Sequence, residues 1–136
     1  MKFEKELIVG GIEPSPIPYS PGARCGPLIF AAASSTDPKT GLAVNGTIEE
    51  ETERTIENIR RILEFAGSGL KDVIKATVYL TNFDDFEKYN KVYAKYFKEG
   101  GFPARATLGI SRLYGNNQIE IDVIALIRKK SRRRTN

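Results

Sequence analysis

The sequence predicts an α+β fold with one mixed β-sheet and two helices packed on one of its faces. Apolar residues recur at helical spacing over residues 48–66 and 84–98, and they alternate with a period of two over residues 73–81. Strands and helices alternate in the middle of the chain, but hairpins are predicted at both ends. This layout favours α+β over α/β.

The N-terminal part is predicted to contain three strands. Residues 3–9 form the first, and a proline-rich loop over 13–22 separates it from a hairpin over 23–33 that turns at Gly26-Pro27. The second arm of this hairpin is apolar on both faces, so we expect it to be buried. Cys25 is expected to be a small, buried apolar residue.

Both helices carry recognisable end signals. Thr47 and Glu50 form a capping box before the helix over 48–66, and Gly67 is its expected stop. The helix over 84–98 is expected to start at a cap formed by Asn82 or Asp84. Its aromatic residues recur on one side and are predicted to pack against the sheet.

The last two strands carry polar residues that need an explanation. Residues 101–110 and 118–123 are predicted strands, joined by a loop of turn-forming residues. Arg105 and Thr107 share one face of the first strand, and Glu120 lies on the polar face of the second. A guanidinium can bind a carboxylate through two parallel hydrogen bonds, and a carboxylate in a partly dry pocket can activate water. A structural Arg–Glu ion pair, or two solvent-facing charges, explains the residues equally well.

One face of the sheet is predicted to lie against the helices and the other to meet a second subunit. The second face is expected to carry Lys75, Arg105 and Glu120 among apolar side chains. It is too apolar for open water and too charged for the core of a monomer. We therefore expect a symmetric oligomer.

The composition excludes several kinds of chemistry. The 136 residues include no histidine and one cysteine, which argues against Ser-His-Asp and Cys-His catalysis and against a zinc site. No Walker loop or GxGxxG motif occurs, so we expect no metal and no cofactor. There is no apolar run of membrane-span length, no signal-peptide core near residue 1 and no possible intrachain disulfide. We expect a cytoplasmic location and no membrane partner.

The net charge of +4 arises at the C-terminal end of the sequence. Without the six basic residues of 128–136, 15 Lys and Arg remain against 17 Asp and Glu. We predict one domain over residues 1–127 and a basic, disordered tail over 128–136. Nucleic acid is not expected as a partner except through that tail.

Several motifs follow one another in a characteristic order. They include Pro18-Tyr19-Ser20, Asp37-Pro38-Lys39-Thr40-Gly41 and, most specifically, Pro103-Ala104-Arg105-Ala106-Thr107-Leu108 followed after a loop by Ile119-Glu120-Ile121. With these motifs the chain resembles the RidA/YjgF family, the reactive intermediate deaminases, over nearly its whole length.

The resemblance implies a chorismate-mutase-like fold and a homotrimer with its sites between subunits. It also implies cofactor-independent hydrolysis of imines and enamines, such as 2-aminoacrylate, to 2-oxo acids and ammonia. By position, Arg105 would bind the substrate carboxylate and Glu120 would activate the attacking water. Tyr19 and Asn90 would line the pocket, and the backbone at Thr107 would help to position substrate and water.

The chain departs from the family pattern at three places. It has Ala32-Ala33-Ser34 where many members have Ser-Gly-Gln, Thr107 where the best-studied deaminases have cysteine, and Tyr114 where a proline is usual. The serine hydroxyl usually counted in the site is therefore missing. These departures indicate a divergent subgroup rather than the housekeeping deaminase.

Other functions stay open at this point. One is a catalytically weak trimer that binds a 2-oxo acid at Arg105. Another is the ribonuclease or translation-inhibitor activity described for some relatives, which would depend on the 128–136 tail and Arg60-Arg61. Chorismate mutase activity is a weak alternative, because a shared fold does not carry function.

Overall fold

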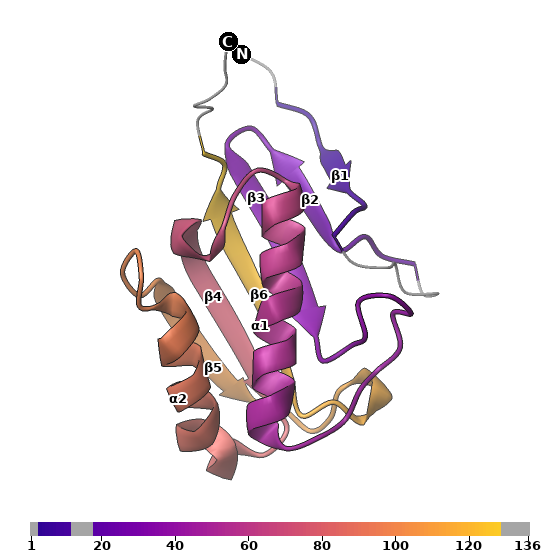
Figure 1. Ribbon diagram of the computed structural model, residues 1–136, viewed down its shortest axis with the longest axis vertical. Helices are drawn as coiled ribbons and strands as arrows, with labels where there is room; N and C mark the ends of the chain where they lie inside the picture. Colours follow the sequence, from indigo (N-terminus) through magenta and orange to yellow (C-terminus); the bar gives the residue numbers. More distant parts are fainter. Residues whose placement is uncertain (1–2, 12–17, 129–136) are drawn as a thin grey trace.

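Six β-strands form one mixed sheet, and both helices lie on the same face of it (Figure 1). The computed structural model describes residues 3–11 and 18–128. The strands are β1 (Glu6–Ile8), β2 (Gly22–Cys25), β3 (Leu28–Ser34), β4 (Val73–Leu80), β5 (Ala104–Gly109) and β6 (Ile119–Leu126). Their order is β1-β2-β3-β6-β4-β5, and of these described strands only β4 and β5 pair in parallel. The predicted α+β layout is confirmed.

Helix α1 (Ile48–Phe65) packs against the middle of the sheet. The Thr47 hydroxyl accepts a hydrogen bond from the Glu50 amide, and the Glu50 carboxylate accepts one from the Thr47 amide, which confirms the capping box. The helix ends one residue earlier than predicted. The chain then reverses at Gly67, whose φ of 87° favours glycine.

Helix α2 (Phe86–Phe97) lies beside α1 and connects β4 to the parallel strand β5. It is shorter than predicted because residues 83–85 form a separate 3-10 turn, in which the Asn82 side chain accepts from the Asp84 amide. Tyr89, Tyr93 and Phe97 are buried, as the aromatic pattern predicted. Within the described residues, neither helix is both long and apolar enough to cross a membrane.

The N-terminal hairpin is confirmed, but its burial differs from the prediction. Strand β1 occupies only residues 6–8 of the predicted 3–9. In β3, Ile29 is fully buried while Phe30 is 43% exposed, so burial of both faces was wrong for the single chain. Cys25 is exposed rather than buried, because it pairs with Leu28 at the turn and faces away from the helices.

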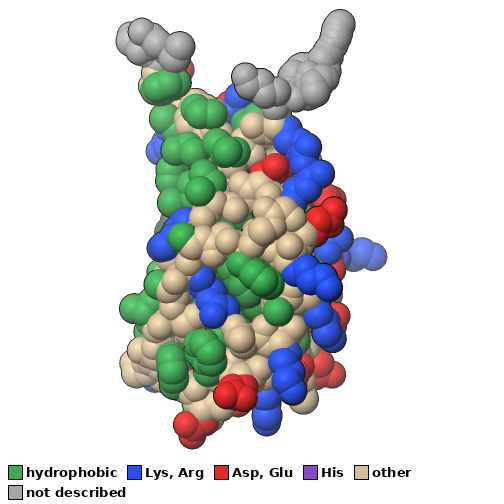
Figure 2. Space-filling model, turned by 90° about the vertical axis from the view of Figure 1, so that its left-hand side faces the viewer, with side chains coloured by type: hydrophobic (Ala, Val, Ile, Leu, Met, Phe, Trp, Pro, Cys, Tyr) green, Lys and Arg blue, Asp and Glu red, His purple; other side chains and the backbone are tan. Residues whose placement is uncertain are grey.

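The face opposite the helices is uncovered in the described part of the chain. It exposes Phe30, Leu108 and Leu126 at 43–45% of their surface. Lys75 and Glu120 lie on this face, as predicted. Figure 2 looks onto the edge of the molecule formed by β5 and α2. Hydrophobic side chains gather on the left of that view and charged side chains on the right. The open face therefore combines exposed apolar side chains with Lys75 and Glu120.

The predicted basic tail lies almost wholly outside the described residues. Only Arg128 of the 128–136 segment is described, and its Nε donates to Asp72 Oδ2 at 3.1 Å. The disorder of the tail therefore stays a prediction.

Candidate functional site

Arg105 lies on β5 at the edge of the sheet, and its side chain is on the helix side. In the parallel pairing of β4 and β5, Arg105 is level with Ala76, which is fully buried in the core beneath the helices. Residues level with each other on paired strands share a face of the sheet. The prediction that Arg105 lies on the face opposite the helices was therefore wrong.

Helix α2 holds the Arg105 guanidinium without neutralising its charge. One Nη donates to Asn90 Oδ1 at 2.7 Å, and the guanidinium carbon lies 4.7 Å from the centre of the Tyr93 ring, 5.5 Å from Tyr89 and 5.7 Å from Phe86. Aromatic faces attract a cation without accepting its directed N–H bonds. Among the described residues no carboxylate lies within 4.0 Å of Arg105. Its remaining donors are therefore free for an anion.

A hollow of about 380 Å³ opens beside this arginine. Its lining consists of Asn90, Tyr93, Ala94, Phe102, Pro103 and Arg105. Thr107 lies on the same side of the sheet, level with the buried Val78. Its hydroxyl is 2.6 Å from the Tyr89 hydroxyl, so that side chain is already engaged with α2. The hollow can bind a carboxylate at its arginine and apolar groups at its walls.

The two buried tyrosines beside Arg105 differ in whether their hydroxyl groups have a hydrogen-bond partner, and this difference can be tested by mutation. Tyr89 bonds to Thr107, whereas the Tyr93 hydroxyl is buried with no hydrogen-bond partner in the described part of the chain, and burial raises its pKa to about 12. We expect Tyr89→Phe to lower the free energy of unfolding by about 1 kcal/mol and Tyr93→Phe to leave it unchanged or raise it. Urea denaturation measures both. A larger loss for Tyr93→Phe would contradict this description.

Glu120 lies on β6, on the open face, between Ser34 of β3 and Tyr79 of β4. Burial raises the pKa of its carboxyl, and the nearby charge of Asp122 raises it further. Tyr79 donates to Asp122 Oδ2 at 2.9 Å, which leaves Glu120 without that donor. A half-buried carboxyl with a raised pKa is a better proton acceptor when ionised than an ordinary glutamate.

A second hollow, of about 370 Å³, opens beside Glu120. Tyr19, which is 52% exposed, forms part of its wall. The remaining lining comes from Ser20, the end of β3, the following loop and the turn before β6: Ser20, Ala32, Ala33, Ser34, Thr36, Gly41, Ala43, Tyr114 and Asn117. A hollow of this size accommodates a small organic acid.

A buried carboxylate that was not predicted holds the loops around the Glu120 hollow. Glu51 of α1 is fully buried and accepts hydrogen bonds from the amides of Gly46 at 3.1 Å and Gln118 at 2.8 Å, and from the Gln118 side chain at 3.0 Å. These bonds tie the loop before α1 to the start of β6 and so position Glu120. Helical spacing could have revealed Glu51, because it lies one turn before the buried Thr55.

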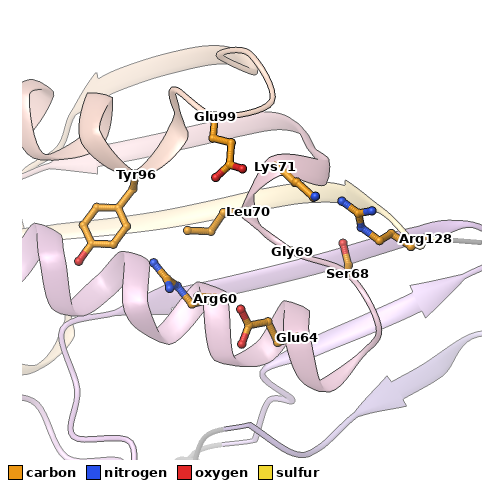
Figure 3. Close-up of a pocket in the computed structure, with 9 residues that line it drawn as sticks. All are labelled: Arg60, Glu64, Ser68, Gly69, Leu70, Lys71, Tyr96, Glu99 and Arg128. Carbon is orange, nitrogen blue, oxygen red and sulfur yellow. The ribbon is translucent and has the colours of Figure 1, made fainter.

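A third hollow, also of about 370 Å³, lies on the helix side between α1, α2 and the end of β6 (Figure 3). Charged side chains of both signs surround it, including Arg60 and Glu64 of α1 and Glu99 after α2. None of the predicted site residues lines it. We therefore place the candidate site at Arg105 and Glu120.

One chain does not bring the predicted site residues together. Arg105, Asn90 and Thr107 form one group on the helix side at the β5 edge, and Tyr19 and Glu120 form another at the Glu120 hollow on the open face. Strand β4 separates β5 from β6. Each group therefore holds only half of the predicted chemistry.

Known proteins resemble this chain over nearly its whole length. Residues 12–127 match the family model described as Endoribonuclease L-PSP. A RutC family protein of Pyrococcus abyssi is 48% identical over 123 residues, which is 89% of this chain and 96% of the relative. The crystal structure of YyfA, a Rid family protein of Yersinia pestis, matches with a TM-score of 0.85 and 34% identity over 91% of this chain and 100% of that one. The chain belongs to the RidA/YjgF family.

Members of the RidA/YjgF family bear different functional names. A protein of Dermatophagoides farinae is 31% identical over 125 residues, which is 90% of this chain and 97% of the relative, and is named 2-iminobutanoate/2-iminopropanoate deaminase. The family model itself is described as an endoribonuclease. Membership confirms the resemblance predicted from the sequence. Because the functional names differ, the reaction of this chain is inferred from the residues of the Arg105 and Glu120 hollows.

Proposed function

We propose that this chain is a cofactor-independent hydrolase that converts imine and enamine intermediates to 2-oxo acids and ammonia. In this proposal it works as a homotrimer, and Arg105 of one subunit and Glu120 of the next flank a single substrate. The observation that carries the proposal is that one chain holds the predicted site residues in two separate groups, an arrangement called the divided site below. The anion-binding group and the proton-transfer group lie on opposite faces of one sheet, each in an open hollow.

The surface of the chain supports a head-to-tail assembly. The open sheet face, which carries Glu120, exposes apolar side chains, and β5 with Arg105 forms the edge of the sheet. If the open face of one subunit packs against the β5 edge of the next, the two halves of the site meet. A contact between two different surfaces closes into a ring under rotational symmetry. A trimer is the smallest ring in which every subunit gives one half to one neighbour and the other half to the second neighbour.

Arg105 would bind and orient the substrate carboxylate. Asn90 occupies one of its donors at 2.7 Å, and the aromatic rings beneath it fix its plane without taking the others. A planar guanidinium that is held in this way can form two parallel hydrogen bonds to one carboxylate. The imine carbon would then lie at a fixed distance from the neighbouring subunit's open face.

Glu120 would move the protons of the hydrolysis. Its carboxylate accepts a proton from water while the water oxygen bonds to the imine carbon, and the proton then passes to the nitrogen. A second proton then passes from the new hydroxyl group to the nitrogen through Glu120. The carbon–nitrogen bond breaks as the carbonyl forms, ammonia leaves, and the 2-oxo acid remains. An enamine such as 2-aminoacrylate first gains a proton at its terminal carbon and loses one from its nitrogen, which converts it to an imine. Proton transfer by one positioned group contributes about 10²–10⁴-fold, which suffices for a substrate that already hydrolyses in water.

The pH dependence of the reaction offers a test of the role of Glu120. The reaction needs ionised Glu120, so kcat/KM should rise with pH through the raised pKa of this carboxyl. The Asp122 charge helps to raise the pKa of Glu120. Asp122→Asn should therefore lower this pKa and move the acid limb of the profile to lower pH. The amide oxygen can still accept from Tyr79. An acid limb that stays in place in Asp122→Asn would show that Glu120 does not set it.

Imines made in situ by an amino acid oxidase provide the direct assay. The wild-type protein should accelerate release of 2-oxo acid and ammonia above a control without protein, and light scattering should give the mass of a trimer. Absence of acceleration across several imines would refute the deaminase proposal. Binding of a 2-oxo acid in titration, without turnover, would then favour the weak-binder alternative.

A further inference from the structure

We infer that the Glu120 hollow selects imines with large apolar side chains over those with small ones. This inference rests on the proposed function and specifies its substrates. It depends on the shape and chemistry of the hollow, which are fixed by Ala32, Ala43 and Tyr114.

Small side chains leave the hollow wide. Ala32 and Ala33 at the end of β3, together with Gly41 and Ala43 in the following loop, place nothing larger than a methyl group in its lining. Ala32 is exposed on the open face, level with Asp122 of β6. A larger or polar residue at these positions would fill the space beside Glu120. The volume of about 370 Å³ exceeds what a one-carbon or two-carbon substrate side chain needs.

An aromatic ring forms the rim of the hollow. Tyr114, which belongs to the lining, is 77% exposed. The turn that carries it is held in place, because Asn45 Nδ2 donates to the carbonyl oxygens of Gly115 at 3.1 Å and Asn116 at 3.2 Å. The turn also packs closely on Ala43, since a Cβ at Gly115 would lie 2.7 Å from the Ala43 methyl group. The ring is therefore presented over the hollow by a fixed turn.

Two polar side chains of the hollow are engaged within the protein, and the hydroxyls of Tyr19, Ser20 and Ser34 also belong to its lining. The Asn117 amide donates to the Ser35 carbonyl at 3.1 Å, and the Thr36 hydroxyl accepts from Asn58 at 3.0 Å. Glu120 remains available for water and substrate. The part of the wall formed by Ala32, Ala43 and the Tyr114 ring is apolar, and it favours an apolar substrate side chain.

The expected selectivity follows from burial of that side chain. Each methylene placed in an apolar pocket is worth roughly tenfold or more in kcat/KM. We expect imines derived from leucine and phenylalanine to exceed those derived from alanine and 2-aminobutyrate by at least about tenfold in kcat/KM. The imines are generated by an amino acid oxidase, and each rate is corrected for its own uncatalysed hydrolysis.

The outcomes separate this inference from the proposed function. Acceleration that increases with apolar side-chain size supports the inference. Acceleration of the small imines, with equal or lower kcat/KM for the large ones, overturns the inference and leaves the proposed function standing. Acceleration of none of the four overturns both.

Two variants of the rim residue test the mechanism of selection. Tyr114→Ala removes the ring and should reduce the ratio of kcat/KM for leucine imine to that for alanine imine by about tenfold. Tyr114→Phe keeps the ring and should preserve the ratio. Because Tyr114 is exposed, neither change should disturb folding, which circular dichroism can verify. An unchanged ratio in Tyr114→Ala would show that the rim does not select the substrate.

Discussion

Replacement of Arg105 by alanine is expected to lower kcat/KM for imine hydrolysis by about 10²-fold or more. Two charge-assisted hydrogen bonds to the substrate carboxylate are lost, and each contributes about 1.5–3 kcal/mol. The side chain is exposed and forms no ion pair within the described residues, so the fold should tolerate its removal. In situ imine hydrolysis, with thermal unfolding as a check of the fold, measures the effect.

Two control variants separate the effect of the two parallel hydrogen bonds of the guanidinium from the effect of its positive charge. Arg105→Lys keeps the positive charge but cannot form two parallel bonds, so it should recover only part of the lost rate. Asn90→Ala removes the 2.7 Å bond that orients Arg105, and it should raise KM more than it lowers kcat. A value of kcat/KM in Arg105→Ala within about twofold of wild type would contradict carboxylate binding at this residue.

Glu120→Gln is expected to lower kcat by about 10²–10⁴-fold with little change in KM. The amide has the shape of the carboxylate but cannot accept the proton of the attacking water. Burial and the Asp122 charge raise the pKa of Glu120 above its ordinary value, so ionised Glu120 lowers the stability of the fold above that raised pKa. The neutral amide should therefore be as stable as wild type, or more stable, near neutral pH.

A Glu120→Gln variant that loses turnover but keeps its stability would support a catalytic role for Glu120. Single-turnover kinetics and denaturant unfolding on the same preparation provide both values. Unchanged kcat in Glu120→Gln would assign proton transfer to another group. Loss of stability alongside loss of turnover would point to a structural role for this carboxylate.

Local signals predicted the elements of this fold well. The capping box at Thr47 and Glu50 and the reversal at Gly67 lie where the pattern indicated. The helix over 84–98 was too long by a few residues, because a 3-10 turn and an α-helix have similar spacing at a junction. These features depend on residues close together in the sequence.

Features that depend on register between strands were not predictable. Five of the six residues of β5 are exposed, so this strand has no buried face of its own to orient it. Its pairing with β4, in which Arg105 is level with Ala76, places Arg105 on the helix side. A β-bulge between Val73 and Lys75 shifts the start of β4, so that Val73 is buried and Ile74 is 43% exposed. A slip of one residue moves a side chain to the other face, and single-strand patterns do not determine it.

The sequence indicated which residues lie close to one another in the candidate site, but it did not indicate that they form two separate groups. The side chains of Arg105 and Asn90 do meet, and Tyr19 and Glu120 do line one hollow. Their separation into two groups depends on the order of the strands in the sheet, which no local pattern contains. Glu51 was overlooked because a glutamate after a capping box is normally assigned to the helix dipole rather than to the core.

Mixing two inactive variants tests the divided site most directly. Arg105→Ala and Glu120→Gln chains, each inactive alone, are co-expressed with different tags, and the mixed oligomers are purified through both tags. If each site takes Arg105 from one subunit and Glu120 from the next, some sites in mixed trimers contain both intact residues. Each mixed trimer contains one intact site out of three, so the purified mixture should show about a third of wild-type activity. If both residues act within one chain, every site carries a lesion, and the mixture stays as inactive as its parents.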